Sequence, residues 1–171
     1  MRILVACITL LLLTGCDRSR ELPDCIDVKS SPKDYGKFIV NPTTGLAQHV
    51  SGSVWYRCMA GQSFRGKKCL GEPLELTKAE AESYLRDFSH KTGERWRLPT
   101  QNEFEEILET SCDNPPLNPN VFPSVEVKNF WLSDRPWLQN ARFACAIFLF
   151  QGSTSCRLAV QLQQPILMVR D

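Results

Sequence analysis

The sequence has few of the groups from which most catalytic and metal sites are built. It contains only two histidines, His49 and His90, and neither lies in a recognisable motif. A nucleophilic serine or cysteine usually needs a histidine base and an orienting acid, and no such set is visible, nor is a glycine-rich phosphate loop. The carboxylates between Glu103 and Glu109 are typical of a solvated helix face. We therefore predict no catalytic residue, no metal and no cofactor, and a surface position for both histidines.

A strong charge of one sign is also missing. Lysine and arginine number 20 against 19 aspartates and glutamates, so the formal net charge is +1. Such a balance gives no reason to expect nucleic acid as a partner. The basic residues are dispersed except at Arg65, Lys67 and Lys68. This cluster would suit a sulfated or phosphorylated polymer, although a solvated loop is the more ordinary interpretation.

No apolar run is long enough to span a membrane. The longest extends from Ile3 to Leu13, whereas a transmembrane helix needs about 20 residues. Preceded by Arg2, the run has the length of the apolar part of an export signal. Leu13-Thr14-Gly15-Cys16 then has the order of a lipobox, in which small residues precede a cysteine that becomes lipidated. We predict a signal peptide over residues 1–15 and lipid on Cys16; the alternative is an ordinary secretory signal with a chance cysteine.

Lipidation would place the protein in a bacterial cell envelope. A single acyl chain anchors only reversibly, but two or three chains on Cys16 would hold the protein at a membrane almost permanently. The next residue is Asp17, which resembles the signal that keeps lipoproteins in the inner membrane of enteric-type bacteria. We expect the periplasmic side of the inner membrane if Asp17 acts in this way, and the outer membrane otherwise.

Six of the eight cysteines remain after Cys7 leaves with the signal and Cys16 takes lipid. An even number in an exported chain favours disulfides, whereas zinc needs closely spaced cysteine pairs, which are absent. One neighbouring pair flanks a loop with Gly61 and Gly66, and closing it would contribute roughly 3 kcal/mol. A second pair flanks a predicted hairpin turn at residues 151–154. The predicted bridges are therefore Cys58–Cys69, Cys145–Cys156 and, by elimination, Cys25–Cys112.

Two helices are indicated by their start signals. Thr77–Glu80 and Thr100–Glu103 are both capping boxes, in which the threonine and the glutamate satisfy each other's free backbone N–H groups. Apolar residues then follow at helical spacing from Ala81 to Phe88, and Gly93 ends the first helix. Phe104 begins the inner face of the second helix. We assign both aromatic faces to the core.

The remaining chain divides into a polar tether and strand-like runs. Residues 16–35 are polar, include Pro23 and Pro32, and are predicted to be a tether; residues 36–171 are predicted to form one domain. Strand-like runs before and after the helices indicate an α+β fold with a mainly antiparallel sheet, stabilised by disulfides. These runs are Gly36–Val40, Val54–Cys58, Phe130–Ser133, Phe143–Phe150, Cys156–Leu162 and Ile166–Val169.

Several segments, in the right order, resemble a known family, the Lcl-type C-terminal domain, named for a bacterial collagen-like adhesin. The most distinctive is Trp96-Arg97-Leu98-Pro99-Thr100 followed by Glu103, in which Trp96 and Leu98 are expected in the core. The resemblance extends from about Gly36 to the C-terminus. The other matching segments are Thr44–Leu46, Trp55–Gln62, Asn118–Pro123, Phe130–Ser133 and Met168–Arg170.

The resemblance implies a C-type-lectin-like fold, related to formylglycine-generating enzymes and sulfatase-modifying factors. Those enzymes use paired cysteines, a role in which Cys145 and Cys156 would have to serve, but a structural disulfide explains them more simply. The chain departs from the family at Gly45–Gln48 and in the apolar run Phe143–Phe150. These departures put any glycan-binding surface of the adhesin in doubt here, because a fold does not carry a function with it.

One more loop favours an interface. Asp134-Arg135-Pro136-Trp137 combines an aromatic ring and a charge, a composition common in protein interfaces, although Trp137 would equally suit the core. Our leading hypothesis is a non-catalytic envelope lipoprotein that binds a protein partner, such as a secretion or pilus component or a toxin that it neutralises. The alternatives are an anionic-glycan-binding module and a cysteine-dependent modifying enzyme. The candidate binding residues are Arg65, Lys67, Lys68, Arg135 and Trp137.

Overall fold

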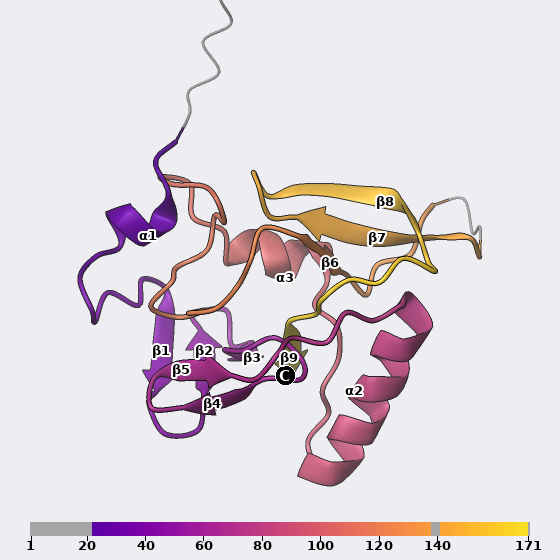
Figure 1. Cartoon of the computed structure of the whole chain (residues 1–171), viewed down its shortest axis with the longest axis horizontal. Helices are drawn as coiled ribbons and strands as arrows, with labels where there is room; N and C mark the ends of the chain where they lie inside the picture. Colours follow the sequence, from indigo (N-terminus) through magenta and orange to yellow (C-terminus); the bar gives the residue numbers. More distant parts are fainter. Residues whose placement is uncertain (1–21, 138–140, 171) are drawn as a thin grey trace, which may run out of the picture.

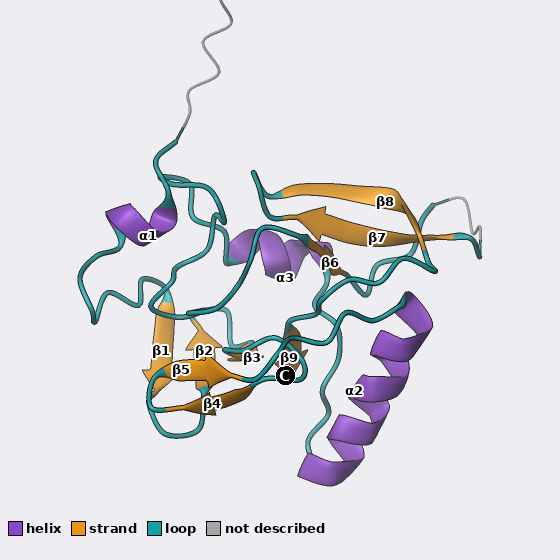
Figure 2. Cartoon of the chain, viewed as in Figure 1, coloured by secondary structure: helices purple, strands orange, loops and turns teal. Residues whose placement is uncertain are grey.

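The computed structural model describes residues 22–137 and 141–170, and within them it has three helices and nine strands (Figure 1, Figure 2). None of these helices combines the length and the apolar character that a membrane crossing requires. In chain order the elements are α1 (Cys25–Val28), β1 (Phe38–Asn41), β2 (Leu46–His49), β3 (Val54–Tyr56), β4 (Ser63–Arg65), β5 (Lys68–Leu70), α2 (Lys78–Thr92), α3 (Gln101–Glu106), β6 (Asn129–Trp131), β7 (Phe143–Phe148), β8 (Ser153–Ala159) and β9 (Met168–Arg170).

The strands form three antiparallel sheets. One has the order β1-β2-β3-β9, a second is the hairpin β4-β5, and the third has the order β6-β7-β8. Helix α3 lies between the first and third sheets, and α2 runs along one side of the molecule (Figure 1). The predicted α+β class with mainly antiparallel sheets is confirmed.

Local hydrogen bonds set the first residues of α2 and α3, and a glycine sets the end of α2. The Thr77 backbone N–H donates to the Glu80 carboxylate (2.9 Å), and the Glu80 N–H donates to the Thr77 hydroxyl (3.3 Å). Thr100 and Glu103 repeat this exchange at the start of α3. Gly93 ends α2 in the left-handed conformation, at φ 71°. The two capping boxes are therefore confirmed as helix starts.

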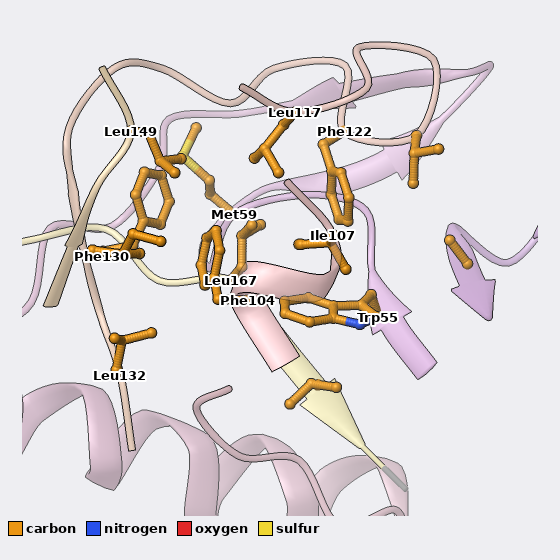
Figure 3. Close-up of a cluster of buried hydrophobic side chains, with 14 of the residues drawn as sticks. Trp55, Met59, Phe104, Ile107, Leu117, Phe122, Phe130, Leu132, Leu149 and Leu167 are labelled. Carbon is orange, nitrogen blue, oxygen red and sulfur yellow. The ribbon is translucent and has the colours of Figure 1, made fainter. Parts of the chain in front are cut away.

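The larger core cluster surrounds α3 (Figure 3). Phe104 of α3 is fully buried, and its ring meets the indole of Trp55 edge-on at 5.8 Å between centroids. Trp55 in turn meets Phe122 edge-on at 6.0 Å. Each aromatic side chain of this size removes 150–250 Å² of surface from water, at roughly 25 cal/mol per Å². This contact chain joins β3, α3 and the long loop after α3.

A second cluster lies under α2. Ala81 and Leu85 are the buried residues of this helix, and they share the cluster with Trp96, Leu98 and Trp131. The indole N–H of Trp131 donates to the backbone carbonyl of Leu76, just before α2 (2.7 Å). The expectation that Trp96 and Leu98 enter the core is confirmed.

Three disulfides join the predicted pairs, Cys25–Cys112, Cys58–Cys69 and Cys145–Cys156. The first corrects the predicted tether, because residues before 36 belong to the folded part. Cys25 starts α1, and its backbone N–H donates to the carbonyl of Asp113 (2.9 Å), whose own N–H donates to Pro23 (3.0 Å). The domain thus includes α1, and its start at residue 36 was placed too late.

Several strand bounds also differ from the sequence expectation. β2, β4 and β5 were not predicted, because they are short and carry no clear alternation of apolar and polar residues. β3 ends at Tyr56, two residues before the predicted end. β8 begins at Ser153 and ends at Ala159, and therefore takes in residues assigned to the preceding turn. Pairing with a partner strand sets these limits, and for β3 that partner includes the distant β9.

Candidate binding surfaces

The segment Asp134–Trp137, called the Trp137 loop below, is held by hydrogen bonds at its start. It follows β6, and the Ser133 backbone N–H donates to the Pro99 carbonyl (2.8 Å). The Asp134 carboxylate accepts from the backbone N–H of Gln101, the first residue of α3 (2.6 Å). A carboxylate at this position also suits the positive end of the helix dipole. The base of the loop therefore has a defined position on α3.

Trp137 itself is fully exposed. Its side chain keeps 98% of its accessible surface, so it is not part of the core. Arg135, two residues earlier, is exposed as well. A tryptophan in water is unusual because the indole is one of the largest apolar side chains. The loop therefore presents an aromatic ring and a cation to solvent.

A groove lies beside this ring. It has a volume of about 690 Å³ and is lined by Pro136, Trp137, Phe143 and residues 154–157 of β8. Phe143, the first residue of β7, is 39% exposed. Among the described residues that line the groove, Arg157 is the one charged residue, and none is a carboxylate. The groove combines apolar walls with a positive charge.

The predicted basic cluster forms a separate surface on the β4–β5 hairpin. Arg65 and Lys68 are paired directly across the two strands, and Gly66 and Lys67 form the turn with φ 56° and 71°. All three cations are exposed. Like charges placed opposite each other destabilise a sheet. The described residues supply no carboxylate that forms an ion pair with any of the three, so the tip of the hairpin keeps its positive charge.

A hollow of about 520 Å³ lies behind this hairpin, and Lys29, Arg57, Lys67 and Lys68 line it. Arg57 is buried, and burial lowers the pKa of its guanidinium. Its Nε and Nη2 donate to backbone carbonyls at 2.9 and 2.7 Å, and its guanidinium lies 4.4 Å from the centre of the Phe64 ring. Arg57 thus supports the hairpin, while Lys67 and Lys68 are exposed residues of the lining.

The comparisons with known proteins identify the family. A family model for the Lcl C-terminal domain matches residues 46–170, which is more than half of the chain. The chain belongs to the Lcl C-terminal domain family. The match extends from the first residue of β2 to the last residue of β9 and includes both surfaces, whereas α1 and β1 precede it. No curated protein and no solved structure matched the chain.

His49 of this Lcl C-terminal domain corrects a sequence expectation. We expected a surface residue, but its side chain is only 4% exposed, packed against the ring of Phe38. Burial lowers the pKa of His49, partly offset by Glu106. The Ser51 hydroxyl and the Glu106 carboxylate lie 2.8 and 3.6 Å from the same ring nitrogen, Nδ1.

This arrangement differs from a serine–histidine–acid triad, in which the serine and the acid contact opposite ring nitrogens. The other nitrogen of His49, Nε2, is buried and has no hydrogen-bond partner among the described residues. The three side chains therefore lack the arrangement of a serine–histidine–acid triad. His90, by contrast, is exposed in the last turn of α2, as expected.

Glu103 also differs from the solvated carboxylate that we expected. It accepts two hydrogen bonds from the Arg97 guanidinium, both at 2.8 Å, and caps α3. Burial alone would raise the pKa of Glu103, but the hydrogen bonds from Arg97 and Thr100 outweigh it and lower the pKa. The ion pair joins the family segment Trp96–Thr100 to α3, which is a structural role.

Three predicted features lie outside the described residues, namely the signal peptide over residues 1–15, the lipidation site Cys16 and its neighbour Asp17. In the parts of the Lcl C-terminal domain chain that are described, no three histidine, cysteine or acidic side chains gather as a metal site would need. Of the five predicted binding residues, the structure groups Arg135 with Trp137, and Arg65 with Lys67 and Lys68. The contribution of Phe143 and β8 to the groove was not predicted, because it depends on how the β7–β8 hairpin lies beside the loop.

Proposed function

We propose that this protein is a non-catalytic, lipid-anchored envelope lipoprotein whose Lcl C-terminal domain binds a protein partner. The observation that carries the proposal is the exposure of Trp137 (98%) on a loop whose base is bonded to α3. Tryptophan and arginine are the residues that most often dominate the energetics of protein interfaces.

The location and partner class follow from the sequence. Lipid on Cys16 would hold the domain at the periplasmic side of the inner membrane if Asp17 acts as a retention signal, and at the outer membrane otherwise. Partners in that compartment include components of secretion or pilus machines and a toxin that the lipoprotein neutralises. We infer a C-type-lectin-like fold from the family segments and the α+β arrangement.

A cysteine-dependent enzyme is less well supported. Cys145 and Cys156 are joined in a disulfide, and Cys145 is fully buried in the core around α3. A reactive cysteine needs an accessible thiolate. Titration of the unreduced folded protein with a thiol reagent tests this point, and a reactive thiol at either position would support the enzyme instead.

The test of the leading proposal is a crosslinked pull-down from intact envelopes with the lipidated, C-terminally tagged protein. We expect one stoichiometric protein partner, lost with Trp137→Ala and retained with Phe150→Ala. Phe150 is an apt control because it is also an exposed aromatic residue, 52% accessible, at the other end of the β7–β8 hairpin. Recovery of polysaccharide alone, or of nothing beyond a Cys16→Ser control, would contradict the proposal.

The basic hairpin favours a second candidate, an anionic-glycan-binding module. Lys67 and Lys68 line a hollow whose described lining has four basic residues and no carboxylate, although Lys29 forms ion pairs with Asp34 and Glu109 outside that lining. Binding of a sulfated polysaccharide, measured at increasing salt, tests it: electrostatic binding to exposed cations weakens strongly as salt screens them. We expect the combined change of Arg65, Lys67 and Lys68 to glutamine to remove such binding, while Arg86→Gln on α2 leaves it unchanged. Binding insensitive to salt would contradict this candidate.

A further inference from the structure

The edges of the sheets differ greatly in how they are covered. In the four-stranded sheet, β1 is only four residues long, and β9 is bridged by Arg97, whose backbone exchanges two 3.0 Å hydrogen bonds with Val169. In the third sheet, the edge strand β6 has three residues, and Phe130 and Trp131 are buried. The opposite edge, β8, is the longest strand of the described structure, with seven residues.

β8 is also the edge that opens onto the groove. Its residues alternate between exposed and half-buried from Ser153 to Leu158, and nothing among the described strands pairs with its outer side. Figure 1 shows β8 along the outer border of the β6-β7-β8 sheet. Such an edge leaves backbone N–H and C=O groups available to another chain. The strand contains no proline, and its edge-protecting features, the charged Arg157 and a bulge, lie towards its C-terminal half, which leaves Ser153–Ser155 without them.

One local irregularity limits where another strand would pair. The register between β7 and β8 shifts between Ala144 and Ala146, where β8 holds one extra residue beside the disulfide-bonded Cys156. The backbone N–H of Arg157 donates to the Ser155 hydroxyl (3.3 Å), so that donor is occupied within the strand. Regular pairing is therefore favoured on the Ser153–Ser155 side of this bulge.

The side chains beside this edge indicate the chemistry of the occupant. Trp137 and Phe143 form an apolar wall, and Arg157 adds a positive charge within the groove. The Thr154 hydroxyl is buried and has no hydrogen-bond partner among the described residues. Arg135 extends the positive charge on the adjoining loop. An added strand presents alternate side chains to one face, so apolar and acidic side chains would meet these residues.

We propose that β8 accepts an extended, acidic segment of the partner protein as an additional antiparallel strand, with apolar side chains of that segment against Trp137 and Phe143. The inference rests on the proposed protein-binding function and adds the mode of binding and the chemistry of the partner. Strand addition uses backbone hydrogen bonds for affinity and side-chain pockets for specificity. A second copy of this chain fits less well, because β8 carries Arg157 and no acidic residue, so two β8 edges have no complementary charges.

The experiment selects peptides from a randomised library on the full-length protein, each peptide long enough to pair with β8. The enriched peptides are then synthesised, and their binding is measured with amide hydrogen exchange and titration. We expect an excess of aspartate and glutamate alternating with apolar residues, and slowed exchange in β8. Methylation of alternate backbone nitrogens in a peptide should abolish binding, since it removes donors without changing side chains.

Charge-reversal variants test whether the acidic peptides bind beside β8. Arg157→Glu should weaken the acidic peptides by about tenfold or more, whereas Arg86→Glu, an exposed change on α2, should not. No enrichment, enriched peptides without an acidic excess, or unchanged exchange in β8 would each overturn strand addition. If the envelope pull-down still recovers a partner that depends on Trp137, only the binding mode fails. If the pull-down also fails, the proposed function itself is wrong.

Discussion

The two disulfide-closed hairpins of this domain have the same covalent spacing but different attachments to the rest of the molecule. Cys58–Cys69 and Cys145–Cys156 both join cysteines separated by 11 positions. In the β7–β8 hairpin, the four residues from Ala144 to Ile147 are all buried. In the β4–β5 hairpin, no strand residue is fully buried. One hairpin is therefore part of the core, and the other lies on the surface.

The turns of the two hairpins also differ in how well their residues suit the backbone conformation. Each turn contains a residue with φ of 71°, which is Gly152 after β7 and Lys67 after β4. Glycine adopts this left-handed conformation without a steric cost, but a lysine does not. In the β7–β8 hairpin, the turn residue and the buried strand both favour the observed conformation. The β4–β5 hairpin has an unfavourable residue in its turn. The disulfide and the contact of Arg57 with Phe64 offset that cost.

We expect the largest effect on stability from a substitution in β7, the strand that belongs to the core. Ile147→Ala on β7 removes a fully buried side chain, and we expect a loss of about 2–5 kcal/mol in the free energy of unfolding. Urea denaturation measures this. Phe148→Ala, which changes a neighbouring but 38% exposed residue, is the matched control and should cost less. Equal losses would mean that β7 is not held by the core.

The second-largest loss of stability is expected when the disulfide of a hairpin is removed, and this loss should differ between the two hairpins. By chain entropy alone, either bridge contributes about 3 kcal/mol. We expect nearly this loss for the double change of Cys145 and Cys156 to alanine. Replacing Cys58 and Cys69 should cost less, about 1–2 kcal/mol, because the surface hairpin can then fray and regain entropy without exposing the core.

Hydrogen exchange provides the readout for that difference. Amides of β4 and β5 should exchange much faster once Cys58–Cys69 is removed, while those of β7 keep their protection after removal of Cys145–Cys156. If the β4–β5 amides stay protected without their disulfide, noncovalent contacts hold the surface hairpin as firmly as the core one, and the comparison fails.

A smaller loss is expected for Gly152→Ala. The alanine would have to adopt φ of 71°, and its Cβ would lie 2.6 Å from Cδ1 of Leu108. The left-handed conformation costs about 1–2 kcal/mol, and the leucine side chain must also move. Thermal unfolding should show the decrease. A neutral result would mean that the turn relaxes to another conformation, which a structure of the variant would reveal.

The smallest effect should have the opposite sign. Lys67→Gly relieves the left-handed strain and removes one of three neighbouring cations, so we expect stabilisation of less than about 1 kcal/mol. The gain is limited because glycine also has more conformational freedom in the unfolded chain. Lys33→Gly, at an exposed site without positive φ, should not stabilise. Destabilisation by Lys67→Gly would show that the lysine side chain makes a favourable contact.

The sequence predicted those parts of the fold that depend on neighbours in the chain. The capping boxes at Thr77 and Thr100 gave both helix starts, because the two interacting residues are three positions apart. β4 was missed because Ser63-Phe64-Arg65 is too short to show a period. Its position depends on Tyr56, whose hydroxyl accepts from the Phe64 backbone N–H at 3.0 Å.

The candidate site, too, was predicted only where it depends on neighbouring residues in the chain. The loop of Arg135 and Trp137 was identified from its composition, but its exposure depends on whether distant segments cover it, and the sequence left this undecided. His49 was misplaced because its cover comes from Phe38 and its charged neighbour Glu106 lies on α3. The edge position of β8 could not be derived at all, since strand order is a property of the whole sheet.

The Cys25–Cys112 bridge has a mechanical consequence. If Cys16 carries lipid, the stretch from Asp17 to Asp24 reaches at most about 28 Å when fully extended, so the domain stays close to the membrane. A force that pulls a bound partner away from the envelope would enter the chain at Cys25. The bridge connects Cys25 to a residue 87 positions later, between α3 and β6. The load therefore passes directly to the centre of the domain, and α1 and β1 cannot be peeled away one hydrogen bond at a time.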